Sequence, residues 1–333
     1  MPKPKEFDVI IVGGGIAGLS AGVTSARLGR RTAILTGDLP GGQLMSIEKI
    51  EGLPGHPDGI AGYDLCPIMQ DQAVAAGADF VVSALVRLDA LRSKWCVASG
   101  QGDLIGAAIV LATGSEFKKL EVPGEGRLTG NGVSHCATCD APLLRGRIVA
   151  VVGGGDSALQ EALTLAEFAS KIILCHRGTA LNGQMCYRER VTAHPKIEIR
   201  CNTVVTEILG ETVVTGLRTQ DLGSGAFRDV ATAAVFAYVG LRPNTSFLQN
   251  LLGLDPAGRI PTDALTRTEL PGIFAAGTIR ANSPCRAASA AGDGATAAVA
   301  VDRFLANGSW PDGAFNKQGE ILPAFSTLRA DGR

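Results

Sequence analysis

Two cysteines stand three residues apart in the segment Cys136-Ala137-Thr138-Cys139. This spacing suits a reversible disulfide or one half of a zinc site. Zinc would need two further ligands at a similar spacing, but the sequence has no second Cys-x-x-Cys and no close pair among its four histidines. The spacing therefore favours a redox pair, with zinc binding and an incidental pair as the alternatives. The other cysteines are Cys66, Cys96, Cys175, Cys186, Cys201 and Cys285. In a cytosolic chain we expect such scattered cysteines to be small buried hydrophobic residues.

Two glycine-rich segments could hold phosphate groups. They are Gly13-Gly14-Gly15-Ile16-Ala17-Gly18 and Gly153-Gly154-Gly155-Asp156-Ser157-Ala158. Each follows an apolar run and precedes an Ala/Leu-rich stretch of helical character and a second apolar run. The elements expected are a strand at 7–12, a helix ending near 28–29 and a strand at 32–35, and then a strand at 148–152, a helix ending near 167–168 and a strand at 171–174. The order strand, glycine turn, helix, strand is thus predicted twice.

The two segments have the residue types that a dinucleotide site needs. The first glycine permits a tight turn, the third lets the backbone approach a pyrophosphate, and the last residue (Gly18 or Ala158) allows close packing of helix on strand. The helix N-terminus adds amide donors and a favourable dipole. One such motif is weak, but two copies about 140 residues apart favour two nucleotide sites. Tight turns without a ligand are the alternative.

Length and composition limit the class of protein. The 333 residues predict about two domains, and the 43 glycines are roughly twice the usual share of about 7%. A hydrophobic share of 46% excludes a disordered chain, and a net charge of −1 gives no reason to propose nucleic acid or an anionic membrane as a partner. No apolar run is long enough to span a membrane, and residues 1–6 lead into a strand without the hydrophobic region of a signal peptide. We therefore expect a cytoplasmic protein.

The segment His135-Cys136-Ala137-Thr138-Cys139-Asp140 resembles the low-molecular-weight thioredoxin reductase family. Further matching segments follow in the order and spacing of the family over almost the whole chain. They are Thr36-Gly37 with Gly41-Gly42-Gln43-Leu44, Ala112-Thr113-Gly114, Val239-Gly240-Leu241-Arg242-Pro243-Asn244-Thr245, Pro271-Gly272-Ile273-Phe274-Ala275-Ala276-Gly277, and Arg286-Ala287-Ala288-Ser289-Ala290-Ala291-Gly292. The chain is identified as a member of this family.

The resemblance implies an α/β fold of two Rossmann-like dinucleotide-binding domains, the second inserted into the first. Residues 1–115 and 246–333 would form the FAD-binding domain, and residues 116–245 the NAD(P)H-type domain that carries the cysteines. It also implies a homodimer and a rotation of the inserted domain during turnover. The partner implied is a thioredoxin-like protein or a small-molecule disulfide.

The resemblance also assigns roles at the cysteine pair. Cys139 would lie nearer the flavin, and Cys136 would be the thiolate that attacks the partner's disulfide. Asp140 would handle the proton of the leaving thiol, which requires a raised carboxyl pKa in a dry site. A helix N-cap is the alternative for Asp140. His135 could stabilise the Cys136 thiolate if the two are also neighbours in space.

The remaining site residues carried over from the family bind cofactors. For FAD they are Gly13, Gly15, Ile16, Ala17, Gly18, Thr36, Gly41, Gly42, Gln43, Leu44, Ala112, Thr113, Gly114, Gly277, Thr278, Arg286, Ala287 and Ala288. For the nicotinamide nucleotide they are Gly153, Gly155, Asp156, Ser157, Ala158, His176 and Arg177.

The sequence departs from the family where NADPH would bind. NADPH-specific members carry His-Arg-Arg and a further arginine four residues beyond the second. Here Arg177 remains, but Gly178 and Asn182 occupy the other arginine positions. A 2′-phosphate clamp without two of its three charged donors should bind NADPH poorly, unless Arg188 or Arg190 replaces them. No acidic residue ends the strand to bind the ribose of NAD.

The flavin half departs as well. The family's Gly-Asp is Gly277-Thr278 here, and the glutamine after the final arginine is Ala287. One lost hydrogen bond costs only about 0.5–1.5 kcal/mol, so FAD binding should be weakened or remodelled rather than abolished. Cys285 replaces a usual aromatic residue, as a packing substitution or as a third thiol near the flavin.

The expected function is therefore a flavin-dependent disulfide oxidoreductase of thioredoxin-reductase type. NADPH is the usual donor of the family, but the altered clamp makes it doubtful. A ferredoxin-dependent reductase, a dithiol oxidase or a non-catalytic nucleotide-binding relative is the alternative.

Overall fold

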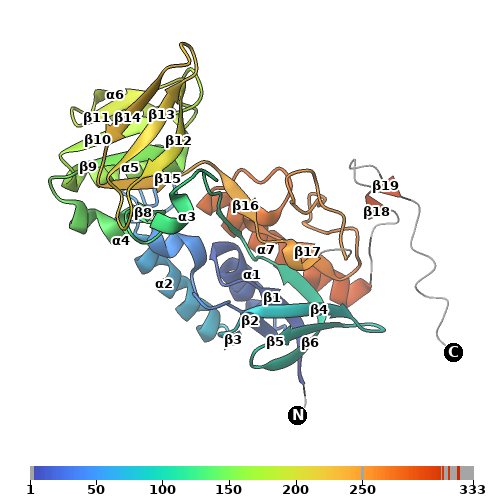
Figure 1. The fold of residues 1–333 in the computed structure, drawn as a ribbon. Helices are drawn as coiled ribbons and strands as arrows, with labels where there is room; N and C mark the ends of the chain where they lie inside the picture. The colour runs from blue at the N-terminus through green and yellow to red at the C-terminus, as the bar shows by residue number, and fades with distance from the viewer. Residues whose placement is uncertain (1–3, 249–250, 309, 311–313, 316–320, 323–333) are drawn as a thin grey trace. The chain divides into compact units, whose positions relative to one another are not determined.

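The computed structural model describes residues 4–248, 251–308, 310, 314–315 and 321–322 (Figure 1). The chain divides into two compact units. Unit 1 consists of Met1–Met45, Lys49–Glu116 and Pro243–Arg333, and unit 2 consists of Ser46–Glu48 and Phe117–Arg242. Residues 323–333, placed in the FAD-binding domain by the sequence, lie outside the described residues.

Unit 1 is built on a mixed sheet in the order β3-β2-β1-β6-β5-β4, with β17 also paired to β6. Its strands are β1 (Lys5–Val12), β2 (Thr32–Leu35), β3 (Asp79–Val81), β4 (Leu85–Ala90), β5 (Trp95–Ser99), β6 (Gly102–Leu111) and β17 (Ile273–Ala275). Its helices are α1 (Ile16–Arg27), α2 (Gly62–Ala75) and α7 (Ala287–Asn307), with 3-10 turns η1 (Gly42–Ser46), η3 (Ser246–Leu248) and η4 (Gly277–Ile279). Short strands β18 (Ala314–Phe315) and β19 (Ile321–Leu322) pair with each other.

The parallel part of this sheet brings its loops to one edge. Strand β1 runs parallel to β2 and β6, with Val12 beside both Leu35 and Leu111. The last four residues of β1 are almost completely buried, as expected for a strand covered on both faces. Because the strands end together, the segments that follow them meet at the carboxyl edge, where such sheets bind ligands.

Glycines let the helices of unit 1 approach closely. Helices α1 and α7 cross where a Cβ on Gly294 would lie only 2.0 Å from the carbonyl oxygen of Ala17. On the other side of α1, a Cβ on Gly22 would lie 2.3 Å from the side chain of Ile34. Part of the glycine excess therefore serves helix packing rather than ligand binding.

Unit 2 contains a parallel sheet in the order β11-β10-β9-β15-β8 and an antiparallel sheet β12-β13-β14. The strands are β8 (Val133–Ser134), β9 (Ile148–Val152), β10 (Lys171–Cys175), β11 (Ile197–Arg200), β12 (Thr203–Leu209), β13 (Gly216–Asp221), β14 (Phe227–Ala231) and β15 (Ala234–Ala237). The helices are α3 (Glu125–Leu128), α4 (Ala137–Asp140), α5 (Asp156–Phe168) and α6 (Met185–Ala193), with the 3-10 turn η2 (Ala141–Leu144).

The order strand, glycine turn, helix, strand occurs in both units as predicted. It is β1–α1–β2 in unit 1 and β9–α5–β10 in unit 2, with both strand pairs parallel. The chain passes between the units through β7 (Ser115–Phe117) and β16 (Leu241–Pro243), which pair with each other. Unit 2 is thus inserted into unit 1, and the expected α/β architecture of two Rossmann-like units is confirmed.

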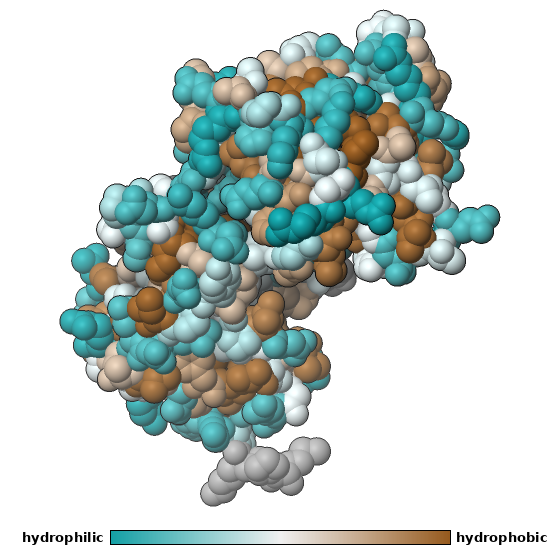
Figure 2. Space-filling view, turned by 90° about the vertical axis from the view of Figure 1, so that its left-hand side faces the viewer, coloured by the Kyte–Doolittle hydropathy of each residue, from teal (hydrophilic) through white to brown (hydrophobic). Residues whose placement is uncertain are grey.

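The described helices include none that is both long and apolar enough to cross a membrane. Figure 2 shows hydrophilic and hydrophobic residues interspersed over the face that it draws. Single exposed apolar side chains are normal on protein surfaces. Leu143 is an extreme case, because 82% of it is exposed only four residues after Cys139.

Candidate functional site

The two cysteines of the Cys-x-x-Cys segment are joined by a disulfide, with their Cα atoms 5.4 Å apart. Helix α4 begins directly after Cys136, whose sulfur accepts a hydrogen bond from the backbone N–H of Cys139 at 3.2 Å. The backbone N–H of Cys136 in turn donates to the hydroxyl of Ser134 at 3.1 Å. A donor aimed at the Cys136 sulfur stabilises negative charge there, so the local geometry favours a thiolate at Cys136 when the disulfide is reduced.

The surroundings of the pair are partly open. Cys139 is exposed and Cys136 is half-buried. Asp140 stands at the N-cap position of the 3-10 turn η2, but its side chain makes no capping hydrogen bond. The structure therefore does not support the N-cap alternative for Asp140. Asp140 is half-buried and directly follows Cys139 in the chain.

His135, the residue before the cysteine pair, is held by an aromatic side chain and a backbone carbonyl. The His135 ring stacks on Phe117 with a centroid distance of 5.6 Å, and its Nδ1 donates to the backbone oxygen of Ala237 at 2.8 Å. Phe117 also meets the ring of Tyr238 edge-on at 5.2 Å. Because a carbonyl oxygen only accepts, the His135 ring carries hydrogen on Nδ1, and the ring is held by Phe117 and the Ala237 carbonyl.

A buried carboxyl group that the sequence did not reveal lies behind helix α4. Glu161 of helix α5 is 7% exposed and packs among apolar residues of unit 2. Burial raises the pKa of Glu161 to about 7, while the backbone N–H of Ala137 and the hydroxyl of Tyr238 lower it and the charge of Glu48 raises it. The available signal was a lone glutamate on the otherwise apolar face Ala158, Ala162 and Leu165.

The other cysteines follow the sequence expectation only in part. Cys66 and Cys175 are buried, and burial raises the pKa of each thiol to about 11. The expectation is wrong for Cys186 and Cys285, which are exposed. Cys186 lies on the polar helix α6, and Cys285 lies in a loop before α7 with a left-handed φ of +54°. Cys96 and Cys201 are half-buried.

The first glycine turn brings several of the expected flavin residues together. Gly13 has φ +122°, and a Cβ there would lie 2.1 Å from the carbonyl oxygen of Ala112, so Gly13 and the Ala112–Thr113 backbone are in direct contact. A Cβ on Gly18 would lie 1.8 Å from the oxygen of Gly13, which explains the close seat of helix α1 on the turn. By contrast, a Cβ on Gly15 would meet nothing within 4 Å.

This open space at Gly15 suits an anionic group. Ile16 and Ala17 form the first turn of α1, whose N-cap, Gly15, supplies no side-chain cap, and the first turn contains no acidic residue. The backbone amides at the start of α1 are therefore available to a phosphate. The chemistry of this cradle fits the pyrophosphate of FAD.

Residues 36 and 41–44, which the sequence predicts to bind FAD, lie around the same turn. Gly41 donates its N–H to the oxygen of Gly14 at 2.9 Å, and the Cβ position of Gly42 lies 3.3 Å from the Cα of Gly15. A Cβ on Gly14 would lie 2.8 Å from the Cβ of Thr36. Gln43 and Leu44 follow in the turn η1, and the Gln43 amide donates to the oxygen of Ser115.

The altered position Thr278 is engaged within the protein. The Ser115 hydroxyl donates to the Thr278 hydroxyl at 2.9 Å, and the Thr113 hydroxyl donates to the oxygen of Asn244 at 2.8 Å. Gly114 accepts the backbone N–H of Asn244 at 3.0 Å. Thr278 is therefore part of a polar network instead of presenting the carboxylate that the family has at this position.

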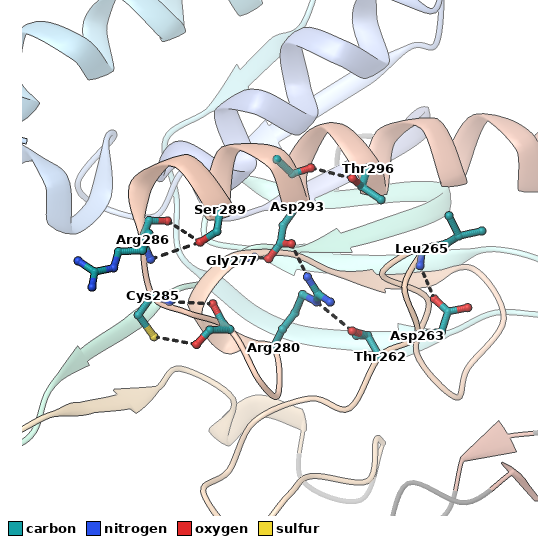
Figure 3. A network of polar contacts seen from close by, with 12 residues as sticks. Thr262, Asp263, Leu265, Gly277, Arg280, Cys285, Arg286, Ser289, Asp293 and Thr296 are labelled. Carbon is teal, nitrogen blue, oxygen red and sulfur yellow. Dashed lines mark hydrogen bonds and ion pairs between the residues drawn. The ribbon is translucent and has the colours of Figure 1, made fainter. Parts of the chain in front are cut away.

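A carboxylate that the sequence did not single out binds the start of the 3-10 turn η4, which contains Thr278. Asp293 of helix α7 accepts the backbone N–H of Gly277 at 3.0 Å and forms an ion pair with Arg280 (Figure 3). Arg280 also donates to the hydroxyl of Thr262 at 2.9 Å. Figure 3 shows Arg280 between Asp293 and Thr262, so the segment 277–280 is fixed to α7 immediately beside Thr278.

The last segment that the sequence predicts to bind FAD, residues 286–288, lies at the start of helix α7. The Arg286 N–H donates to the hydroxyl of Ser289 at 3.3 Å, and that hydroxyl donates to the Arg286 oxygen at 2.9 Å. Ala287 and Ala288 open the helix and are half-buried. Cys285 makes its hydrogen bonds within its own loop, to Ser283 (Figure 3).

The second glycine turn is covered by a loop. The backbone N–H groups of Asn182 and Gly183 both donate to the oxygen of Gly154, at 2.9 and 3.0 Å. Asp156, the first residue of helix α5, accepts the N–H of Gln184 at 2.6 Å. Ser157 and Ala158 complete the first turn of α5. The loop is thereby tied to the start of the helix, and the nearest atom to a Cβ on Gly155 is the Asn182 oxygen at 3.7 Å.

The residues expected to bind the nucleotide lie around this loop. Of the family's three arginine positions, only 177 holds an arginine, so no cluster of positive charge forms from these positions. The His176 ring packs on Gly154, 2.3 Å from where a Cβ would lie, and Arg177 is exposed. Gly153 adopts φ +145° and contacts the backbone of Tyr238.

The two arginines named as substitutes for the clamp lie on helix α6. Among the described residues, the buried Nε of Arg188 has no hydrogen-bond partner, and Arg188 donates to the sulfur of Met185. Arg190 lies over the ring of Tyr187 at 5.7 Å.

Comparisons with known proteins agree with these features. The model of the pyridine nucleotide-disulphide oxidoreductase family matches residues 7–294. The thioredoxin reductase of Treponema pallidum is 37% identical over 300 residues, which cover 90% of this chain and 97% of that protein. The crystal structure of the Lactococcus lactis thioredoxin reductase is similar with a TM-score of 0.88 at 33% identity, covering 90% of this chain and 99% of that one. The thioredoxin reductase of T. acidophilum also gives a TM-score of 0.88, at 31% identity and with 91% and 100% covered.

The family match spans most of the chain, and the relatives are matched over nearly their full length. The family is FAD-dependent and its members are enzymes, so the expected class of reaction is confirmed. The chain belongs to the pyridine nucleotide-disulphide oxidoreductases and, within them, to the thioredoxin reductase family, as a flavin-dependent disulfide oxidoreductase.

Proposed function

We propose that unit 1 binds FAD and that unit 2 binds the nicotinamide nucleotide and carries the redox pair. The observation that carries this proposal is the contrast between an uncapped, open helix start at Gly15 and a disulfide at the start of α4. The FAD contacts proposed are the turn 13–18, Thr36, residues 41–44 and 112–114, Gly277, Thr278 and residues 286–288. FAD bound there would take two electrons from the nicotinamide nucleotide and, once reduced, would pass them to the Cys136–Cys139 disulfide.

The chain's own residues then carry out thiol–disulfide exchange. The Cys136 thiolate attacks one sulfur of the partner disulfide, so a mixed disulfide forms and the partner's other sulfur leaves as a thiolate. Asp140 supplies the proton to that leaving sulfur. Cys139 next attacks the Cys136 sulfur, which releases the second partner thiol and restores the Cys136–Cys139 disulfide. Two electrons have then moved from the dithiol to the partner.

The partner proposed is a thioredoxin-like protein disulfide, with small-molecule disulfides as weaker substrates. The curated relatives are named thioredoxin reductases, and one of them, from Mycobacterium leprae, is a bifunctional thioredoxin reductase/thioredoxin. The exposed Leu143, close in sequence to Cys139, supports a protein partner, because an apolar side chain beside a reactive disulfide can be covered by that partner.

For the electron donor we propose a nicotinamide nucleotide whose 2′-phosphate is poorly recognised. Support comes from Gly178 and Asn182 at two of the three family arginine positions, which leaves Arg177 as the one remaining donor of the clamp. The loop that holds these positions is well tied to Gly154 and Asp156. The binding place is therefore retained while its selectivity for phosphate is reduced.

Turnover of a small aromatic disulfide reagent tests both parts of the proposal. We expect yellow protein whose turnover is lost in Cys139→Ser and kept in the matched variant Cys186→Ser, an exposed cysteine on α6. The ratio of kcat/KM for NADPH over NADH should lie within about tenfold, because one exposed charge pair contributes up to about 1 kcal/mol.

Four other outcomes would contradict the proposal. Reduction only by ferredoxin, or dithiol oxidation with oxygen as the acceptor, would assign another donor or acceptor. Absence of any turnover with any reductant would indicate a non-catalytic relative. Colourless protein that FAD does not reconstitute would contradict the flavin site.

We further propose a cytoplasmic homodimer. The six cysteines outside the pair are all free thiols, which fits a reducing compartment.

A further inference from the structure

Helix α5 packs directly on the helix that carries the redox pair. Ala158 and Ala162 of α5 share one buried cluster with Ala137 of α4 and Ala141 of the following turn. Glu161 lies on this same strip of α5 and is 7% exposed. Burying a carboxyl group between apolar helices costs folding free energy, because burial penalises its charged form.

The contacts of Glu161 lead to the redox pair. The backbone N–H of Ala137, the residue after Cys136, lies against both the Glu161 carboxyl and the Tyr238 hydroxyl. Within the part of the chain that the structure describes, the Glu161 Oε2 atom and the Tyr238 hydroxyl are both buried without a hydrogen-bond partner of normal geometry. Buried polar atoms without a partner are rare in folded proteins, so these two call for an explanation.

Every other titratable group acting on this cluster is acidic. The negative charge of Glu48, from the segment Ser46–Glu48, raises the pKa of Glu161, and that of Asp140 at the end of α4 raises the pKa of Tyr238. Both negative charges favour a proton on the buried groups. A thiolate formed at Cys136 adds one more negative charge, one residue from the Ala137 amide that Glu161 contacts.

We propose that Glu161 is a positioning residue of the redox pair. Its carboxylate, on the buried side of helix α4, takes up a proton when the Cys136–Cys139 disulfide is reduced. The inference rests on the proposed cycling of this pair. It assigns to unit 2 a second carboxyl group in addition to Asp140, on the buried side of α4.

The electrons and protons of this step balance with an ordinary dithiol as reductant. Dithiothreitol gives up two electrons and two protons as its own sulfur–sulfur bond forms, and the Cys136–Cys139 bond breaks. One proton goes to the Cys139 sulfur, and Cys136 remains a thiolate. The second proton goes to the ionised Glu161 carboxylate.

The expected effect is a pH-dependent change in the reduction equilibrium. A neighbouring thiolate raises the proton affinity of Glu161. Roughly tenfold corresponds to two unit charges about 12 Å apart at an effective dielectric constant near 20, and a shorter separation gives a larger effect. Below about pH 6, Glu161 is neutral with or without the thiolate, and a glutamine in its place should behave identically. Above about pH 9 the carboxylate is charged and disfavours the thiolate, so the wild-type pair should be about tenfold harder to reduce, or about 30 mV lower in potential.

The test measures the reduction midpoint of the pair in dithiothreitol buffers from pH 6 to pH 9. The FAD-loaded protein is equilibrated, quenched with a maleimide and digested, and mass spectrometry of the peptide with Cys136 and Cys139 gives the reduced fraction. The variants are Glu161→Gln and, as a matched control, Glu167→Gln, an exposed glutamate of the same helix. Tyr238→Phe removes a hydroxyl that lowers the pKa of Glu161 and should move the transition to higher pH.

Wild type and Glu167→Gln should give one curve, and Glu161→Gln should separate from it by about tenfold between pH 6 and pH 9. Parallel curves at every pH would overturn the inference while leaving the proposed function intact. A pair that no buffer reduces would instead overturn the proposed function. If Glu161→Gln does not fold, the Tyr238→Phe curve decides, and an unshifted transition there would overturn the inference.

Discussion

The two strand–turn–helix segments have the same backbone plan but present opposite chemistry. Helix α1 starts at an open space over Gly15 with no acidic residue in its first turn. Helix α5 starts with Asp156, which accepts the N–H of Gln184 and fastens a covering loop. A carboxylate at a helix start reduces its attraction for a further anion. This difference fits the proposal that the first turn holds the pyrophosphate of FAD and that the second binds the nicotinamide nucleotide.

A second difference lies one turn further along each helix. Counted from the first residue, Ala21 of α1 corresponds to Glu161 of α5, and both are buried. The helix of unit 1 packs on α7 through glycine and alanine, whereas the helix of unit 2 packs on the redox helix α4. The sixth residue of the helix is thus apolar in α1, which packs on α7, and carboxylic in α5, which packs on the helix of the redox pair.

The largest effect is expected from a side chain at the first glycine turn. Gly13→Ala forces an alanine into φ +122° and against the Ala112 oxygen, so unit 1 should lose more than about 4 kcal/mol of stability and its FAD. Gly29→Ala is the matched control, because Gly29 has φ +78° with no atom within 4 Å of a Cβ, and should cost only about 1 kcal/mol. Urea unfolding and flavin content measure both. Equal costs would show that the close approach is unimportant.

The next effect is a pH-dependent stability that belongs to unit 2. Burial raises the pKa of Glu161 from 4.5 to about 7, so its contribution is complete below about pH 4.5 and is lost as the pH rises through about 7. Relative to Glu161→Gln, the wild type should lose about 3 kcal/mol between pH 4 and pH 8. Urea midpoints at several pH values measure the difference, with Glu167→Gln as control. A constant difference would contradict the buried carboxyl.

A third prediction restores the charges missing from the second turn. The double change Gly178→Arg and Asn182→Arg should raise kcat/KM for NADPH about tenfold, or about 1.4 kcal/mol, through new bonds to the 2′-phosphate. The value for NADH should not change, which separates phosphate recognition from a general gain. The arginine at 178 requires the His176 ring to move, because a Cβ there lies 2.6 Å from its Nε2. Asn182→Arg alone therefore serves as the control, and no gain in either variant would contradict the proposed clamp.

The smallest effect is expected from the matching repair in unit 1. Thr278→Asp restores the family's carboxylate beside Ser115 and should tighten FAD binding about fivefold, or about 1 kcal/mol. Fluorescence titration of the apoprotein with FAD measures the affinity. Weaker binding would mean that the Ser115–Thr278 hydrogen bond is itself part of the flavin site.

The sequence predicts the local elements because periodicity and glycine spacing act over short distances. The strands at 32–35 and 148–152 and the helices after both glycine turns lie where they are expected. The disulfide between Cys136 and Cys139 agrees with the redox pair that the three-residue spacing favoured over zinc binding and an incidental pair.

Features that depend on contacts between distant segments could not be read in this way. Glu161 is a helix residue like any other until α4 covers it, and Asp293 becomes a support for Gly277 only once α7 returns to the first sheet. The exposure of Cys186 and Cys285 was mispredicted for the same reason, because composition does not show which face of a helix or loop remains uncovered.

The visible spectrum under anaerobic conditions tests the central claim most directly. Adding NADPH or NADH to the yellow protein should bleach the flavin, and adding an aromatic disulfide reagent should restore the colour in wild type but not in Cys139→Ser. This result would show electrons moving from the nicotinamide through the flavin to the cysteine pair. A flavin that neither nucleotide bleaches, or a colour that returns equally in Cys139→Ser, would contradict the account.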